Sequence, residues 1–210
     1  MIRDNLKKIL LFVFIFNSVL LYAQKKQLAV ARELLKSGKE LAKAEKSMQT
    51  LLDDSVNWTN TKIWVMLCDV LTKQYEQGNE KLYLKQKYDT AAFFSVTKRM
   101  YETMASFDSV DARLDTPTPV SPKYRERHAQ LHNSIRPNLF NGGTYFLHLK
   151  NYKTAYDYFD NYIRTDKQSL FTGYDYEHKD ALMPHAAYWA MYCGYKLKDT
   201  EKTMRHLRLA

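Results

Sequence analysis

The 210-residue chain has few of the residues that dominate fibrous, disordered or disulfide-stapled proteins. It holds only 6 glycines and 5 prolines, which excludes a collagen-like or low-complexity chain. Because 45% of its residues are hydrophobic, wholesale disorder is excluded as well. With 2 cysteines, the chain cannot be a small domain held together by several disulfides.

The chain also lacks an apolar run long enough to cross a bilayer. Its longest run, residues 9–21, is shorter than the roughly 20 residues that a spanning helix needs. A short basic segment precedes the run, and Ala23 follows it directly before Gln24. This order of basic, apolar and small residues is typical of a secretory signal. We predict that residues 1–23 are a signal peptide cleaved after Ala23, rather than a lasting anchor, so that the mature chain keeps no stable membrane anchor.

Acidic residues are outnumbered, with 23 against 32 basic residues and a net charge of +9. A basic chain can bind nucleic acid, but an exported protein rarely meets it, so we expect no nucleic-acid partner. Affinity for the anionic surfaces of a cell envelope explains the positive net charge more simply than nucleic-acid binding does. We predict export to the periplasm or outer envelope of a bacterium. A eukaryotic secretory route stays open, because Asn57-Trp58-Thr59 is a glycosylation acceptor pattern.

Motifs that carry catalysis are absent: no G-x-S-x-G elbow, phosphate-binding loop or dinucleotide glycine pattern occurs. His128 and His132 stand four residues apart, a spacing that places two zinc ligands on one helix face. However, Ala129 occupies the position where a zinc protease has glutamate, and a third ligand would have to come from a distant residue such as His178 or His185. We expect no enzyme, no cofactor and no metal, and a partly exposed polar face around the histidines.

The two cysteines, Cys68 and Cys193, both lie within apolar helical patterns. A cysteine in such a place behaves as a small buried hydrophobic residue. We predict two core thiols, although export would also permit a bridge.

Apolar residues recur every three or four positions, which predicts helices that pack by one face. Gly38 is placed to end the first of them. No stretch alternates between apolar and polar residues as a strand would. Three segments show the helical pattern: Leu28, Ala31, Leu34 and Leu35; Leu41, Ala44, Met48, Leu51 and Leu52; and Ile63, Met66, Leu67, Val70 and Leu71.

The clearest internal unit runs from Leu139 to Phe159, with Gly143, Phe146 and Ala155 between them. The two small residues would let two helices approach closely, and the two phenylalanines would fill the space between the helices. This spacing resembles the tetratricopeptide repeat (TPR), a pair of antiparallel helices.

Two other stretches repeat this frame more loosely. They begin at Leu28 and Ala187, and their second helices are marked by Ala44 in one and by Thr203 and Leu207 in the other. A further first helix starts at Ile63 and has its predicted partner at residues 91–107. After a turn at residues 115–119, an extra helix is predicted from about Ser121.

These units predict an all-α, irregular TPR-like helix-hairpin solenoid over residues 24–210. Solenoids need a polar capping helix at each end, and the pattern before Ala210 is apolar. We therefore expect that the chain is truncated at its C-terminus or that a partner covers that end.

The resemblance implies a role in binding. In TPR arrays the first helix of each pair lines a concave surface, and the lysine and asparagine clamp that holds a peptide carboxylate there is missing. The resemblance thus implies an aromatic groove for an extended peptide, or for a glycan. The positions that it makes ligand-facing are Phe140, Thr144, Tyr188, Tyr192 and Tyr195.

The sequence as a whole predicts a non-catalytic scaffold or adaptor with a protein or peptide partner. Two alternatives stay open: the recognition arm of a larger enzyme or sensor whose catalytic domain lies beyond residue 210, and a carbohydrate-binding module. Tyr174 and Tyr176 lie where the helical period breaks, in a segment that is either a functional loop or a lid on the last helix pair.

Overall fold

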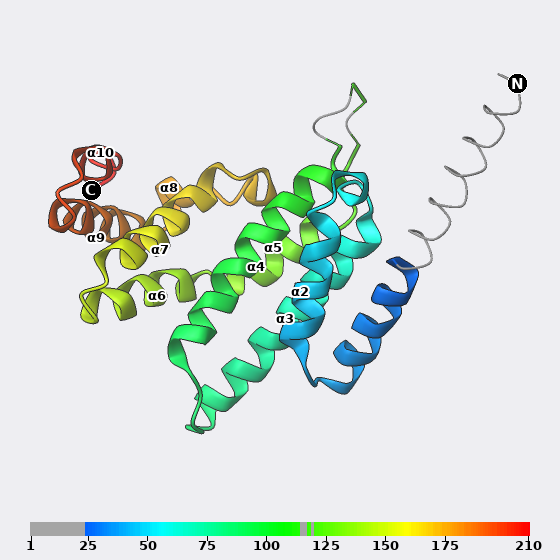
Figure 1. Cartoon of the computed structure of the whole chain (residues 1–210). Helices are drawn as coiled ribbons and strands as arrows, with labels where there is room; N and C mark the ends of the chain where they lie inside the picture. Colours follow the sequence, from blue (N-terminus) through cyan, green and yellow to red (C-terminus); the bar gives the residue numbers. More distant parts are fainter. Residues whose placement is uncertain (1–23, 114–116, 119) are drawn as a thin grey trace, which may run out of the picture. The chain divides into compact units, whose positions relative to one another are not determined.

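The computed structural model describes residues 24–113, 117–118 and 120–210, and these residues form helices and turns without a strand (Figure 1). The predicted all-α class is therefore confirmed. The predicted signal peptide lies outside the described residues, as does most of the predicted turn at residues 115–119. None of the helices in the described ranges has both the length and the apolarity needed to cross a bilayer.

The described chain divides into two compact units, and the division falls inside helix α3 (Thr61–Tyr83), after Gln74. The first unit contains a helix over residues 24–37, helix α2 (Leu41–Leu52) and the 3₁₀ helix η1 (Ser55–Asn57). It ends with the first part of α3. Gly38 has a φ of 66° and ends the first helix, as predicted, because glycine adopts this conformation without steric cost.

The core of the first unit is formed at the positions that the helical period picked out. Its buried residues include Ala31, Leu41, Ala44, Met48, Leu52, Ile63, Met66, Leu67, Val70 and Leu71. A polar contact joins α2 to α3, since the Gln74 side chain donates a hydrogen bond to Glu45 Oε2 (2.8 Å). The fold of this unit thus follows directly from the apolar pattern.

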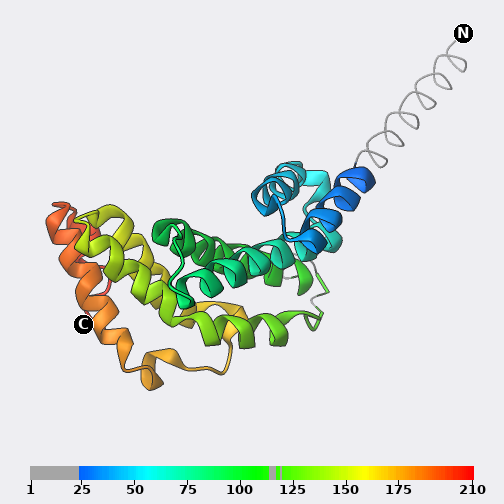
Figure 2. The same cartoon turned by 90° about the horizontal axis from the view of Figure 1, so that it is seen from below.

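The second unit begins at Tyr75 and contains the remaining helices. Helix α6 packs on α7, α7 on α9, and α9 on α10, while α4 packs on α5 and α6. In Figure 2 this succession runs from the green helices through yellow-green to orange. The elements are α4 (Thr90–Asp111), α5 (Arg125–Ile135), α6 (Pro137–His148), α7 (Tyr152–Arg164), η2 (Thr165–Lys167), η3 (Ser169–Phe171), α8 (Tyr176–Lys179), α9 (Leu182–Lys196) and α10 (Thr200–Met204).

The extra helix predicted from Ser121 begins later than expected. Helix α5 starts at Arg125, and Ser121 and Pro122 belong to the segment before it. The backbone N–H of Tyr124 donates to the carboxylate of Asp111 (2.9 Å), at the end of α4. A contact from another helix therefore fixes where α5 begins, and the local sequence cannot show this.

The second helix of the last pair is shorter than the repeat frame predicts. Helix α10 ends at Met204, and Leu207 lies exposed in the following turn instead of in the core. The N–H of Leu207 donates to the carbonyl of Met204 (3.2 Å), a tight turn that rotates the side chain away from the face expected of a continuing helix.

Small residues permit the closest helix contacts of the second unit. A Cβ atom added to Gly143 would lie 2.6 Å from the Phe159 ring, and Ala155 is fully buried. A Cβ atom at Gly194 would lie 2.5 Å from the backbone nitrogen of Thr203. The predicted close approach at Gly143 is therefore present, and α9 and α10 approach at least as closely.

We predict that Gly194→Ala destabilises the second unit. Alanine favours a helix over glycine by up to about 1 kcal/mol, but its Cβ would meet the backbone of α10, which cannot rotate away as a side chain can. The expected net loss is about 1–3 kcal/mol in the free energy of urea unfolding.

The matched control for this prediction is Asn141→Ala, at an exposed position of α6, which should change the free energy of unfolding by less than about 0.5 kcal/mol. A Gly194→Ala protein as stable as the wild type would contradict the close contact.

A buried arginine joins the helices at the centre of the second unit. The guanidinium of Arg136, at the junction of α5 and α6, lies between the rings of Tyr162 and Tyr176, 3.7 and 3.8 Å from their centroids. It forms an ion pair with Asp180 and donates to Thr165 Oγ1 (2.8 Å). Tyr162 donates its hydroxyl hydrogen to the same Asp180 carboxylate (2.5 Å). One side chain thereby connects α5 and α6 to α7, η2, α8 and the approach to α9.

We predict that Arg136→Lys lowers the free energy of unfolding by about 3 kcal/mol, because an ammonium group cannot stack flat between two rings or reach all its partners at once. Chemical denaturation measures the loss. The control is Arg164→Lys, at a largely exposed arginine whose one ion pair, with Asp160, spans 3.7 Å; it should have little effect. Equal effects at both positions would show that Arg136 has no central role.

Candidate functional site

Helix α9 is buried on one face and open on the opposite face. Tyr188, Tyr192 and Tyr195 are separated by four and three residues, a spacing that places them on one side of the helix. That side points away from the core. Tyr188 is 55% exposed and Tyr195 is 69% exposed, while Tyr192 is half-buried. The residues of the opposite face are Met183, Ala186, Ala187, Ala190, Cys193 and Gly194, all buried.

Two of these tyrosines belong to a continuous row of rings that reaches the neighbouring helix. The ring centroids of Tyr188 and Trp189 are 5.0 Å apart, and those of Trp189 and Tyr192 are 5.7 Å apart. Tyr192 in turn lies 6.2 Å from Tyr152, the first residue of α7. We call these four residues the aromatic surface. Sequence reasoning missed Trp189 and Tyr152 as members, because only packing shows that the two helices meet there.

The other two predicted ligand-facing residues are placed differently. Phe140 lies edge-on against Phe159 and Tyr162 of α7, with centroid distances of 5.5 and 5.8 Å. Thr144 donates its hydroxyl hydrogen to the carbonyl of Phe140 (3.1 Å). Both residues therefore take part in the packing and internal bonding of α6, and they are not part of the row of rings around Tyr188 and Tyr192.

The predicted exposed polar face around the two histidines is wrong. His132 is 0% exposed, and its ring is stacked on Tyr101 of α4 at 4.1 Å. His128 is also buried, 5.8 Å from Phe107 and 5.9 Å from Tyr124. The hydrophobic surfaces of α4 and η3 cover this face, which a count of polar residues within α5 could not reveal.

The environment of the histidines does not resemble a metal site. Neither ring nitrogen of His132 has a hydrogen-bond partner among the described residues. Within the same ranges, no three histidine, cysteine or acidic side chains are arranged so that they could hold a metal ion. His178, considered as a third ligand, lies at the surface with its ring 2.6 Å from the Asp175 carboxylate.

Burial lowers the pKa of both buried imidazoles. The pKa of His128 falls to about 4, mainly through burial and then through the charge of Arg127. The pKa of His132 falls to about 3, through burial and the neighbouring His128. Both rings are therefore neutral at pH 7, and acid must force a charge into an aromatic core.

We predict that this pair makes the fold sensitive to mild acid. In the unfolded chain a histidine has a pKa near 6.5, so below that pH the unfolded state binds more protons than the folded state. The contribution of each histidine is complete above pH 6.5 and declines as the pH falls towards the folded pKa, a loss of about 2 kcal/mol at pH 5. Urea unfolding at pH 7 and pH 5 measures this loss.

The diagnostic variant is His132→Phe, which keeps a ring of similar size and removes the titration. Its loss of stability between pH 7 and pH 5 should be about 2 kcal/mol smaller than that of the wild type. At pH 7 it should be at least as stable, since two unpartnered buried nitrogens are removed. An unchanged pH dependence would mean that His132 is not buried in solution.

The segment around Tyr174 and Tyr176 is packed rather than open. The ring of Phe171 contacts both tyrosines, at centroid distances of 5.8 and 5.5 Å. The hydroxyl of Tyr176 donates to Asn133 Oδ1 of α5 (2.8 Å), and burial raises its pKa to about 12. The segment thus packs on η3 and α5, contacts that differ from the predicted lid on the last helix pair, and the functional loop stays a prediction.

Both cysteines are in the core, as predicted. Cys68 is buried in the first unit, and Cys193 is a free thiol buried on the inner face of α9. Burial raises the pKa of Cys193 to about 12, so this thiol is neutral and unreactive at physiological pH.

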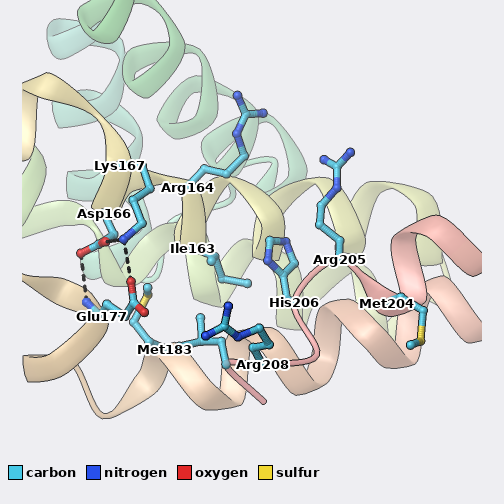
Figure 3. Close-up of a pocket in the computed structure, with 11 residues that line it drawn as sticks. Ile163, Arg164, Asp166, Lys167, Glu177, Met183, Met204, Arg205, His206 and Arg208 are labelled. Atoms are coloured by element: carbon cyan, nitrogen blue, oxygen red, sulfur yellow. Dashed lines mark hydrogen bonds and ion pairs between the residues drawn. The ribbon is translucent and has the colours of Figure 1, made fainter.

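A cavity of about 530 Å³ opens beside the end of α7, where sequence reasoning predicted no site (Figure 3). Lys167 on one side bridges Asp166 (2.8 Å) and Glu177 (2.6 Å), and the backbone N–H of Glu177 donates to Asp166 Oδ1 (2.9 Å); dashed lines in the figure mark these contacts. The cavity is lined by Ile163, Arg164, Asp166, Lys167, Glu177, Met183, Met204, Arg205, His206, Arg208 and Leu209.

His206, which lines this cavity, faces a carboxylate. His206 Nε2 lies 2.7 Å from Asp160, but no residue among those lining the cavity carries a hydroxyl or thiol that the histidine could activate. Burial acts to raise the pKa of Asp160, but the hydrogen bond with His206 and the charges of Arg205 and Arg164 bring it below its usual value. The cavity is lined by both charged and apolar side chains.

No known protein helps to interpret this site. The chain was compared with protein-family models, with curated proteins and with solved structures, and none of the three comparisons finds a match.

Proposed function

We propose that the chain is a non-catalytic, exported TPR-like scaffold that binds an extended peptide segment of a partner protein in a bacterial cell envelope. The observation that carries the proposal is the open face of α9. That helix packs on α7 and α10 by one side and leaves tyrosines uncovered on the other. Exposed tyrosine and tryptophan rings supply large contact areas at low entropic cost, as binding surfaces require.

Support for the TPR-like repeat comes from two hairpins with the same local design. In the α6–α7 turn, Lys150 has a φ of 58° and Asn151 caps α7. In the α9–α10 turn, Lys198 has a φ of 56° and Asp199 caps α10. The same turn with the same kind of cap occurs in both hairpins, which supports the proposal that they are copies of one unit.

Export and the envelope location rest on the sequence of residues 1–23, whose basic, apolar and small residues follow the order of a secretory signal. The absence of a catalytic role is proposed from the missing motifs and from the cavity at the end of α7, whose lining side chains include no hydroxyl or thiol for His206 to activate.

A peptide fits the aromatic surface better than a lone small molecule does. The row of rings continues from α9 to the first residue of α7, so it follows two helices instead of enclosing a cavity. The Lys196 ammonium lies 5.3 Å from the centroid of the Tyr192 ring, so the aromatic surface also carries a positive charge. A glycan could stack on the same rings, and the experiment below separates the two ligands.

We predict that the double variant Tyr188→Ala, Tyr192→Ala weakens peptide binding by at least about tenfold, since aromatic anchors dominate such interfaces. Peptides selected from a random display library on the wild-type chain provide the probe, and fluorescence anisotropy measures their affinity for each variant. Circular dichroism should show unchanged helicity, because neither residue is in the core.

The control is Tyr83→Ala, at a more exposed tyrosine on α3, which should bind the selected peptides as the wild type does. An equal loss in the control variant would contradict the proposed site. If no peptide is selected but glycan-array binding depends on Tyr188 and Tyr192, the chain is a carbohydrate-binding module instead.

A further inference from the structure

Three helix-hairpin turns of the second unit share one unusual feature. Each contains a Leu-Lys pair in which the lysine adopts a left-handed conformation and the leucine is exposed. Glycine is the residue that this conformation favours, so the lysines are not explained by turn geometry. The pairs are Leu84-Lys85 between α3 and α4, Leu149-Lys150 between α6 and α7, and Leu197-Lys198 between α9 and α10, with lysine φ values of 55°, 58° and 56°.

The three turns lie along one edge of the second unit. Phe94, in the first turns of α4, contacts Tyr145 near the end of α6, with a centroid distance of 5.6 Å. Tyr152, which begins α7, contacts Tyr192 near the end of α9 (6.2 Å). The first contact joins the start of α4 to the end of α6, and the second joins the start of α7 to the end of α9. Each of these helix ends borders one of the three turns, so neighbouring turns lie next to one another in chain order.

This edge is strongly basic. The turn segments 81–88, 148–153 and 196–198 contain no acidic residue. The carboxylates that follow two of them, Asp89 and Asp199, accept backbone hydrogen bonds as helix caps. All the lysines of these segments are exposed: Lys81, Lys85, Lys87, Lys150, Lys153, Lys196 and Lys198. We call these segments together the Leu-Lys edge.

The same edge exposes apolar side chains at its turns. Tyr83 is 83% exposed, Leu149 is 58% exposed, and Leu84 and Leu197 are also uncovered. Exposed leucines contribute nothing to the core, and their exposure to water is unfavourable. Apolar side chains surrounded by lysines form the pattern of surfaces that insert shallowly into anionic membranes.

We propose that the Leu-Lys edge docks on the surface of an anionic lipid bilayer. Its leucines and Tyr83 would enter the boundary between headgroups and acyl chains, while the lysines contact the lipid phosphates. A bilayer fits better than an acidic peptide, because the apolar side chains stand on three separate turns. A flat, fluid surface can meet all three turns at once, whereas a short extended segment follows a single groove. The Leu-Lys edge adjoins the peptide site at Tyr152 and Lys196, but the proposal does not depend on that site.

Binding to vesicles tests the proposal. The chain from Gln24 to Ala210 is used, because the buried apolar residues of the described ranges lie within it and residues 9–21 cannot then insert by themselves. We expect this chain to co-sediment with vesicles of phosphatidylcholine and phosphatidylglycerol, and not with vesicles of phosphatidylcholine alone. The triple variant Lys81→Gln, Lys87→Gln, Lys153→Gln should bind at least about tenfold more weakly, because each lysine contributes to attraction by the anionic surface. These three lysines lie outside the left-handed positions, so the turns are preserved.

The matched control removes the same charge elsewhere, through Lys36→Gln, Lys39→Gln and Lys46→Gln, at exposed lysines of the first unit. It should keep most of the vesicle binding. The double variant Leu149→Ser, Leu197→Ser should bind more weakly at raised salt, where charge attraction is screened and insertion carries more of the affinity.

Equal losses in the two triple variants would overturn the proposal, since net charge alone would then explain binding. So would binding that does not change in the leucine variant. Soluble polyglutamate that binds with the same lysine dependence, combined with an absence of vesicle binding, would assign the edge to an acidic protein partner instead. None of these results affects the test at Tyr188 and Tyr192, so the two proposals fail separately.

Discussion

The arrangement of the second unit depends on one buried positive charge. Arg136 carries a guanidinium into a region that would penalise it heavily if it were unpaired. Two tyrosine rings, a carboxylate and a threonine hydroxyl surround it, and they come from segments far apart in the sequence. Because each donor has a fixed direction, α7, η2 and the approaches to α8 and α9 can satisfy the guanidinium in only one arrangement. The position of α9, and with it the open aromatic face, follows from that arrangement.

The parts of the fold that the sequence predicts are those governed by local periodicity. The helices carrying Ala44, Met48 and Ile63 bury the residues that a repeat of three to four positions selects. Gly143 packs against Phe159 as its small size predicts. Each of these features is determined by residues that lie close together in the sequence and share one helix face or one helix pair.

The remaining features depend on contacts between segments far apart in sequence. The two histidines of α5 are polar residues on a predominantly polar helix, and only the aromatic residues of α4 and η3 bury them. Arg136 carries no local sign that it is a core residue. The candidate site was predicted in part: Tyr188 and Tyr195 are exposed as an outward face requires, but Trp189 and Tyr152 join the row of rings only through the packing of α7 on α9.

The inner face of α9 also gives the chain a built-in reporter of its own opening. Cys193 is inaccessible, and its thiol is held protonated, so alkylating reagents and oxidants reach it only when the helix separates from its neighbours. Its rate of chemical modification therefore measures the free energy of that separation, without an introduced label. In an oxidising environment, tight seating of this helix is what keeps the thiol from forming mixed disulfides with other molecules.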